Sequence, residues 1–138
     1  KPKPFSVALY DDALKLLENI RLLLNPGGIF ICSTPNRLDA SPKSVWPLNK
    51  FHLREYLFDE FDALLKTSFI EVEMFGLKRG FGLKLFRRLK KIGLFNFLPD
   101  NMNPVNRFYK GIGCDNFVIV KNNLDTALDF IAVCSNFN

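Results

Sequence analysis

Apolar residues along the chain recur at helical spacing in two segments. Between Asp11 and Leu24 they return every three or four positions, which is typical of a helix with one buried face. Asp11 or Asp12 can cap the start of this helix, and Pro26-Gly27-Gly28 ends it. The same spacing predicts a second helix over Leu53–Lys66.

The remaining apolar runs are short and predict strands. Ile29–Ser33 directly follows the Gly-Gly turn and contains mostly apolar residues, as is typical of a fully buried strand in a parallel sheet. Four further runs are candidate strands: Phe5–Tyr10, Phe69–Phe75, Asn116–Val120 and Phe130–Cys134. The first of these is too short to distinguish a strand from a helix. The alternation of helices and strands predicts an open α/β sheet.

A long polar segment follows the strand predicted at Ile29–Ser33. Residues 34–50 contain three prolines together with Asn, Asp and Ser, so we expect a loop of a length that usually serves binding. In open α/β sheets, ligands bind beyond the carboxyl ends of the strands. The sequence therefore predicts a ligand site where this loop leaves the sheet.

Composition and charge limit the class of protein. With 138 residues and 48% apolar side chains, the chain suffices for one packed domain, residues 1–138. No run is long and apolar enough to span a membrane and no signal peptide is recognisable, so we expect a cytoplasmic protein. Cys32, Cys114 and Cys134 lack metal-ligand spacing, so we expect no metal and interpret the two in apolar runs as buried thiols.

The net charge of +5 comes from seven basic residues, with no acid among them, between Lys78 and Lys91. We interpret residues 77–113 as an insertion or cap. Within it, Phe81–Ile92 predicts an amphipathic helix. One side carries Phe81, Leu85, Phe86, Leu89 and Ile92, and the other carries Leu83 and the basic residues Lys84, Arg87, Arg88, Lys90 and Lys91. Either the apolar side packs on the sheet as a cap, or the helix makes peripheral contact with anionic lipids. No nucleic-acid-binding motif is present, so we expect no nucleic-acid partner.

Several stretches together resemble class I S-adenosylmethionine-dependent methyltransferases of the ubiquinone-biosynthesis-like group, also described as methyltransferase types 11 and 23. They are "LLENIRLLLNPGGIFICSTPN", "NKFHLREY" and "DEFDALLKTSFIEVEMFG", and "NLDTALDFIAVC" resembles the last strand of that group. Asn25 stands where the family turn has Lys, and Lys50 where the family has Pro. The combined match spans residues 14–76 and is specific.

The resemblance implies a Rossmann-like sheet in which strands follow the order 3-2-1-4-5-7-6 and the last is antiparallel. This chain would supply the C-terminal half. Ile29–Ser33, Phe69–Phe75 and Phe130–Cys134 would be strands 5, 6 and 7. Phe5–Tyr10 would be strand 4, which would place Asp11 and Asp12 at a strand end near substrate rather than at a helix cap.

The family cofactor is S-adenosylmethionine, but its binding motif is absent from this sequence. The resemblance places a Gly-rich turn after the first strand and an acidic residue after the second, and neither occurs here. Gly80-Phe81-Gly82 follows no buried strand and is not a substitute. The chain begins with Lys1, so we interpret it as the C-terminal part of a methyltransferase, or an incomplete gene product, that does not bind the cofactor unaided.

Candidate site residues lie around the polar loop. Methyl transfer to a hydroxyl requires a base, and His52 is the only histidine, although it could instead cap a helix or bond the loop backbone. We assign substrate binding to Asn36, Arg37, Arg54, Glu55 and Tyr56, the last three in the first turn of the predicted helix. Alternatives remain: the asparagine suits a turn, Arg54 could pair with a carboxylate, and Tyr56 could anchor the loop.

The sequence therefore predicts methyl transfer to a small-molecule, sugar or lipid-linked acceptor, at oxygen rather than at carbon or nitrogen. The alternative is a non-catalytic α/β module, derived from a methyltransferase, that binds a partner.

Overall fold

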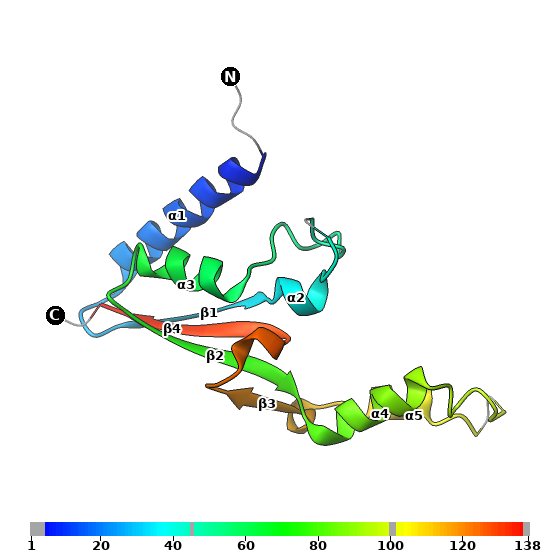
Figure 1. Ribbon diagram of the computed structural model, residues 1–138. Helices are drawn as coiled ribbons and strands as arrows, with labels where there is room; N and C mark the ends of the chain where they lie inside the picture. The colour runs from blue at the N-terminus through cyan, green and yellow to red at the C-terminus, as the bar shows by residue number, and fades with distance from the viewer. Residues whose placement is uncertain (1–4, 45, 100–101, 137–138) are drawn as a thin grey trace.

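The computed structural model describes residues 5–44, 46–99 and 102–136, which form helices and a four-stranded sheet (Figure 1). The helices are α1 (Phe5–Leu23), α2 (Arg37–Ala40), α3 (Phe58–Lys66), α4 (Phe81–Lys91) and α5 (Val105–Lys110). The strands are β1 (Ile29–Pro35), β2 (Glu71–Arg79), β3 (Phe117–Val120) and β4 (Asp129–Ser135). Two short 3-10 turns, η1 (Cys114–Asn116) and η2 (Leu124–Thr126), precede β3 and β4. The predicted α/β class is confirmed.

The strands lie in the order β1-β4-β2-β3, and all described pairs are antiparallel. β4 runs between β1 and β2, with Pro35 opposite Asp129 on one side and Leu77 opposite Asp129 on the other. The carboxyl ends of β1 and β2 therefore meet at the end of the sheet where β4 begins.

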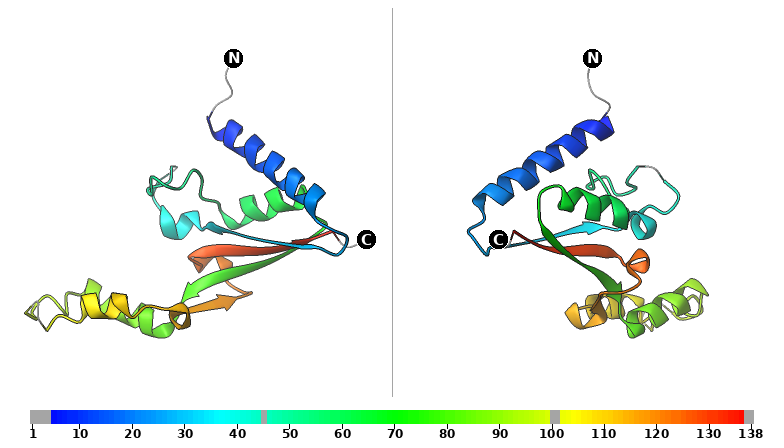
Figure 2. Two further views of the ribbon diagram at one scale, coloured as in Figure 1. Left: turned by 180° about the vertical axis from the view of Figure 1, so that it is seen from behind. Right: turned by 60° about the vertical axis from the view of Figure 1, so that its left-hand side comes forward.

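Helices α1 and α3 cover one face of the sheet (Figures 1 and 2). Their apolar side chains and those of β4 form the core, in which Leu65 and Phe130 are fully buried. The ring of Phe58 packs edge-on against Phe130 with centroids 5.8 Å apart. Burial of such side chains contributes about 1.5–3 kcal/mol each, so this layer holds the sheet in place.

The N-terminal segment is helical, which makes the prediction of a strand at Phe5–Tyr10 wrong. No helix-breaking residue separates Tyr10 from the helical pattern that begins at Asp11, and each residue added to an existing helix gains a hydrogen bond. Asp11 and Asp12 consequently lie inside α1, so they are neither helix caps nor residues at a strand end.

β1 is present as predicted, but it is not a fully buried parallel strand. It pairs antiparallel with β4, and its alternate residues Ile29 and Ile31 are exposed on the face away from α1 and α3. The turn before it requires glycine twice. Gly27 has φ of 74°, and a Cβ on Gly28 would lie 2.8 Å from the carbonyl oxygen of Asn25.

The two cysteines in apolar runs lie on adjacent strands of the helix-covered face. Cys134 is fully buried, Cys32 is half-buried, and both are free thiols, as is the exposed Cys114. The hydrogen bond between the two thiols raises the pKa of Cys32 and lowers that of Cys134, while burial raises both. The Cys32 thiol therefore stays protonated.

The basic segment forms a projecting arm, which we define as residues 80–113 (Figure 2). Residues 77–79, predicted to begin the insertion, still belong to β2. The predicted helix is confirmed as α4, but its apolar side does not pack on the sheet: Phe81 and Ile92 are exposed, whereas Leu83 is buried. The prediction of a sheet-packed cap is therefore wrong. No helix in the described ranges is long and apolar enough to span a membrane.

Candidate functional site

Asn36 links the end of β1 to the turn that precedes β4. Its side-chain oxygen accepts a hydrogen bond from the Leu38 N–H at 3.0 Å and so caps α2. Its amide nitrogen donates to the carbonyl oxygens of Asp125 and Ala127, at 2.9 and 2.8 Å. Because this fully buried amide uses both donors within the chain, Asn36 holds the loop in this arrangement.

Residues 53–57 run alongside the end of β1 and are not helical, so the predicted helix begins too early. Tyr56 forms an isolated parallel bridge with Asn36. Its N–H donates to the Pro35 carbonyl at 3.3 Å, and its carbonyl accepts from the Arg37 N–H at 3.0 Å. These backbone hydrogen bonds replace those of a first helical turn. Arg54, Glu55 and Tyr56 therefore lie beside the carboxyl end of β1 rather than in α3.

His52 and Glu55 form a close pair in this segment. The imidazole Nδ1 lies 2.7 Å from Oε1 of Glu55, and Nε2 lies 3.0 Å from the amide nitrogen of Asn49. The Asn49 side-chain oxygen accepts from the Phe51 N–H at 3.1 Å, which directs the amide nitrogen toward the histidine. An N–H of Asn49 thus points at Nε2, which accepts this hydrogen bond and leaves Nδ1 to donate to Glu55.

The Glu55 carboxylate is almost completely enclosed. The residue is 3% exposed, and its second oxygen, Oε2, has no hydrogen-bond partner among the residues that the structure describes. A buried acceptor without a donor is costly and therefore unusual. Glu55 thus orients His52 through one oxygen, while its other oxygen is enclosed and unused.

Arg54 and Tyr56 connect the loop to the helical layer. The guanidinium of Arg54 lies 4.7 Å from the ring centre of Tyr56 and 5.7 Å from that of Tyr10 in α1. Tyr56 is buried against Phe61, and this burial raises the pKa of its hydroxyl, an effect that the positive charge of Arg54 opposes. These contacts fit the interpretation of Tyr56 as an anchor.

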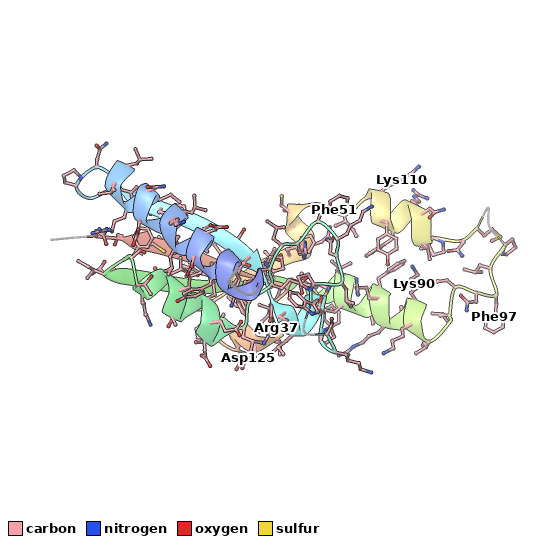
Figure 3. The ribbon with its side chains drawn as sticks, turned by 90° about the horizontal axis from the view of Figure 1, so that it is seen from above. Arg37, Phe51, Lys90, Phe97, Lys110 and Asp125 are labelled. Atoms are coloured by element: carbon pink, nitrogen blue, oxygen red, sulfur yellow. The ribbon has the colours of Figure 1, made fainter. Side chains whose placement is uncertain are left out.

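Arg37 is the first residue of α2 and directly follows Asn36. Its guanidinium is 3.6 Å from Oε1 of Glu60, whose other oxygen accepts from the Leu57 N–H at 3.1 Å at the start of α3. In Figure 3, Arg37 and Asp125 lie in the middle of the molecule, between the helical layer and the arm. The structure thus brings all six predicted site residues to one end of the sheet, in segments 36–37 and 52–56, while their roles toward a substrate stay predictions.

Three further charged residues lie at this end and were missed from the sequence. Both guanidinium NH groups of Arg79 bind the Asp39 carboxylate at 3.0 Å. Burial raises the pKa of the Asp129 carboxyl, the Asp39 charge raises it further, and His52 and Arg79 oppose the shift. The only available signal was a carboxylate directly before the apolar run Phe130–Cys134.

The two glycines of Gly80-Phe81-Gly82 do not form a cradle for S-adenosylmethionine. At Gly80, an added Cβ would meet the backbone oxygen of Asn116 at 2.9 Å, so this glycine serves packing between α4 and η1. At Gly82, an added Cβ would meet nothing within 4 Å. Within the described ranges, no group of three or more His, Cys, Asp or Glu side chains could hold a metal ion.

Comparison with known proteins identifies relatives for about half of the chain. A probable S-adenosylmethionine-dependent methyltransferase of Mycolicibacterium smegmatis is 46% identical over 76 residues, which is 54% of this chain and 29% of that protein. A probable S-adenosylmethionine-dependent methyltransferase of Mycobacterium tuberculosis is 41% identical over 73 residues, 52% of this chain and 26% of that protein. The match therefore spans less than a third of the length of these relatives.

No protein-family model matches the chain, and no solved structure matches it significantly. The two named relatives nevertheless carry the same label as the family recognised from the sequence motifs. The resemblance of this chain to the C-terminal part of S-adenosylmethionine-dependent methyltransferases is therefore confirmed.

Proposed function

We propose that this chain forms the acceptor side of an S-adenosylmethionine-dependent methyltransferase that acts on a hydroxyl group. The observation that carries the proposal is the His52–Glu55 pair at the carboxyl end of β1. Its hydrogen bonds leave Nε2 of His52 as an acceptor that carries no proton. A base oriented by a buried carboxylate is the arrangement required to remove a hydroxyl proton.

The order of the strands supports the assignment to a methyltransferase. In the order β1-β4-β2, with β4 antiparallel to both neighbours, the strands match the arrangement 5-7-6 that the family resemblance implies. The segments 36–37 and 52–56 then occupy the edge of the sheet where such folds bind their ligands.

Each polar group has a limited task in the proposed mechanism. The acceptor hydroxyl takes the place of the Asn49 amide at Nε2 of His52, which accepts the hydroxyl proton, and Nδ1–H stays bonded to Glu55. The resulting imidazolium is stabilised by the carboxylate of Glu55. The methyl donor is S-adenosylmethionine, as in the names of the relatives, and it would be held by parts of the protein outside this chain.

A fusion protein tests the proposal. The part of the M. smegmatis relative that precedes the matched region is joined to the start of this chain, and labelled S-adenosylmethionine is supplied with an extract of small molecules and lipids. We expect the label in a methyl ether or ester. Label on nitrogen or carbon would contradict a hydroxyl acceptor, and a folded fusion that labels no product would favour the non-catalytic module.

A further inference from the structure

The arm has an aromatic core of its own, separate from the core beneath α1 and α3. The ring of Phe86 in α4 stacks on Phe108 of α5 with centroids 3.6 Å apart, and on Phe95 at 4.9 Å. Tyr109 meets Phe86 edge-on, and Lys90 lies 4.9 Å above the Tyr109 ring. These contacts hold the two helices side by side and give the arm a defined shape.

The far end of the arm exposes apolar side chains that this aromatic core leaves out. Phe97 is 90% exposed, Ile92 73% and Met102 67%. Figure 3 shows Phe97 at the end of the arm that is farthest from the sheet, beyond Lys90 and Lys110. Apolar groups gathered on a projecting surface usually mark an interaction site. We call Ile92, Leu94, Phe97, Leu98 and Met102 the tip.

The arm and the end of β2 before it are also strongly basic. Residues 78–113 contain nine of the 19 lysines and arginines and one acidic residue, which gives this segment a charge of +8 and the rest of the chain −3. Six basic side chains line one open depression between the end of β2 and the arm helices: Arg79, Lys84, Arg87, Arg88, Lys90 and Lys91. With Arg79 paired to Asp39, five of these cations have no carboxylate partner among the described ion pairs.

We propose that the arm binds a membrane surface containing anionic lipids, with the tip inserted among the acyl chains and the basic side chains of α4 placed on the lipid headgroups. Apolar insertion and attraction to anionic headgroups reinforce each other when both groups lie on one projecting element. This inference does not depend on methyl transfer.

The arrangement of the tip favours a membrane over other polyanions. Nucleic acid would neutralise the cations, but its phosphates would leave Phe97 and Ile92 in water. A bilayer satisfies both features, because the headgroup layer and the acyl chains meet within the short distance between α4 and the tip. The arm leaves the sheet after Arg79, which is paired to Asp39 beside the candidate site, so a bound membrane would lie on that side of the molecule.

Sedimentation of the 138-residue chain with vesicles tests the inference. We expect the chain to sediment with vesicles of phosphatidylcholine and phosphatidylglycerol and to stay in the supernatant with phosphatidylcholine alone. Replacing Arg87→Glu together with Arg88→Glu should weaken partitioning roughly 100-fold, since each charge near an anionic surface contributes to binding. A matched change on exposed residues elsewhere, Lys15→Glu with Lys43→Glu, should have a much smaller effect.

A second pair of variants separates insertion from surface attraction. Phe97→Ser with Met102→Ser should weaken partitioning about tenfold or more, through lost apolar burial. Leu22→Ser with Leu23→Ser, which alters exposed leucines of α1, should not. The inference would be overturned if the tip variant sedimented as much as the unmodified chain, or if the unmodified chain sedimented equally with neutral vesicles. It would also be overturned if the chain did not sediment with vesicles at all.

A tryptophan at the tip gives a direct measure of depth that requires no loss of binding. In a chain carrying Trp46→Phe and Phe97→Trp, the single tryptophan should shift to shorter emission wavelengths on anionic vesicles, and lipids brominated on their acyl chains should quench it. Binding of the chain to RNA with an affinity equal to that for vesicles, with no quenching by brominated lipids, would assign the arm to nucleic acid instead.

Discussion

Replacing His52 with alanine in the fusion protein is expected to lower methyl-transfer turnover by about 10²- to 10⁴-fold, which is the usual contribution of a general base. The affinity for S-adenosylmethionine should stay unchanged, because His52 lies on the acceptor side, paired with Glu55. Turnover and cofactor affinity would be measured separately, by steady-state kinetics and by calorimetric titration.

An exposed change in the same loop provides the control for this variant. Lys43→Ala should leave both turnover and cofactor affinity unchanged. Normal specific activity of His52→Ala, even with a lower melting temperature, would reduce the histidine to a structural element of the loop.

Replacing Asn36 with alanine should destabilise the fold by about 3 kcal/mol. The change removes the cap of α2 and leaves the carbonyl of Asp125 and the buried carbonyl of Ala127 without their donor. Asn36→Asp should be at least as harmful at neutral pH, because a carboxylate oxygen would then face both carbonyl oxygens. Urea unfolding followed by circular dichroism gives the free energy of unfolding of each variant.

Asn19→Ala, an exposed asparagine inside α1, is the matched control and should change the stability little or slightly raise it. If both Asn36 variants unfolded within about 0.5 kcal/mol of the wild type, which is the range of ordinary surface changes, the amide would not hold the loop. Asn36 would then be free for the substrate-binding role predicted from the sequence.

The local patterns predicted most of the elements because burial in this fold follows them. The helical spacing after Asp11 and the apolar runs Ile29–Ser33 and Phe130–Cys134 appear as α1, β1 and β4. The predictions were wrong where hydrogen bonds to residues distant in the sequence determine the conformation. Residues 53–57 have helical spacing, but they bond to Pro35 and Arg37 at the end of β1 instead.

The same distinction applies to the candidate site. The loop after a strand end is visible in the sequence, so His52 and Glu55 could be predicted from residue type and position. Asp129 could not, because its position opposite Pro35 depends on the return of β4 beside β1, across 94 positions of sequence. The exposure of the tip likewise depends on tertiary packing, because the aromatic core of the arm contains some rings and leaves others in solvent.

Titration of S-adenosylmethionine tests the central claim most directly. That claim is that this chain binds the methyl acceptor, whereas residues outside it bind the methyl donor. We expect calorimetry to detect no binding to the 138-residue chain and micromolar binding to the fusion protein, with the His52→Ala fusion unchanged. Micromolar binding to the chain alone would show that the cofactor site lies within these residues. A fusion that unfolds cooperatively but binds no S-adenosylmethionine would contradict the assignment to a methyltransferase.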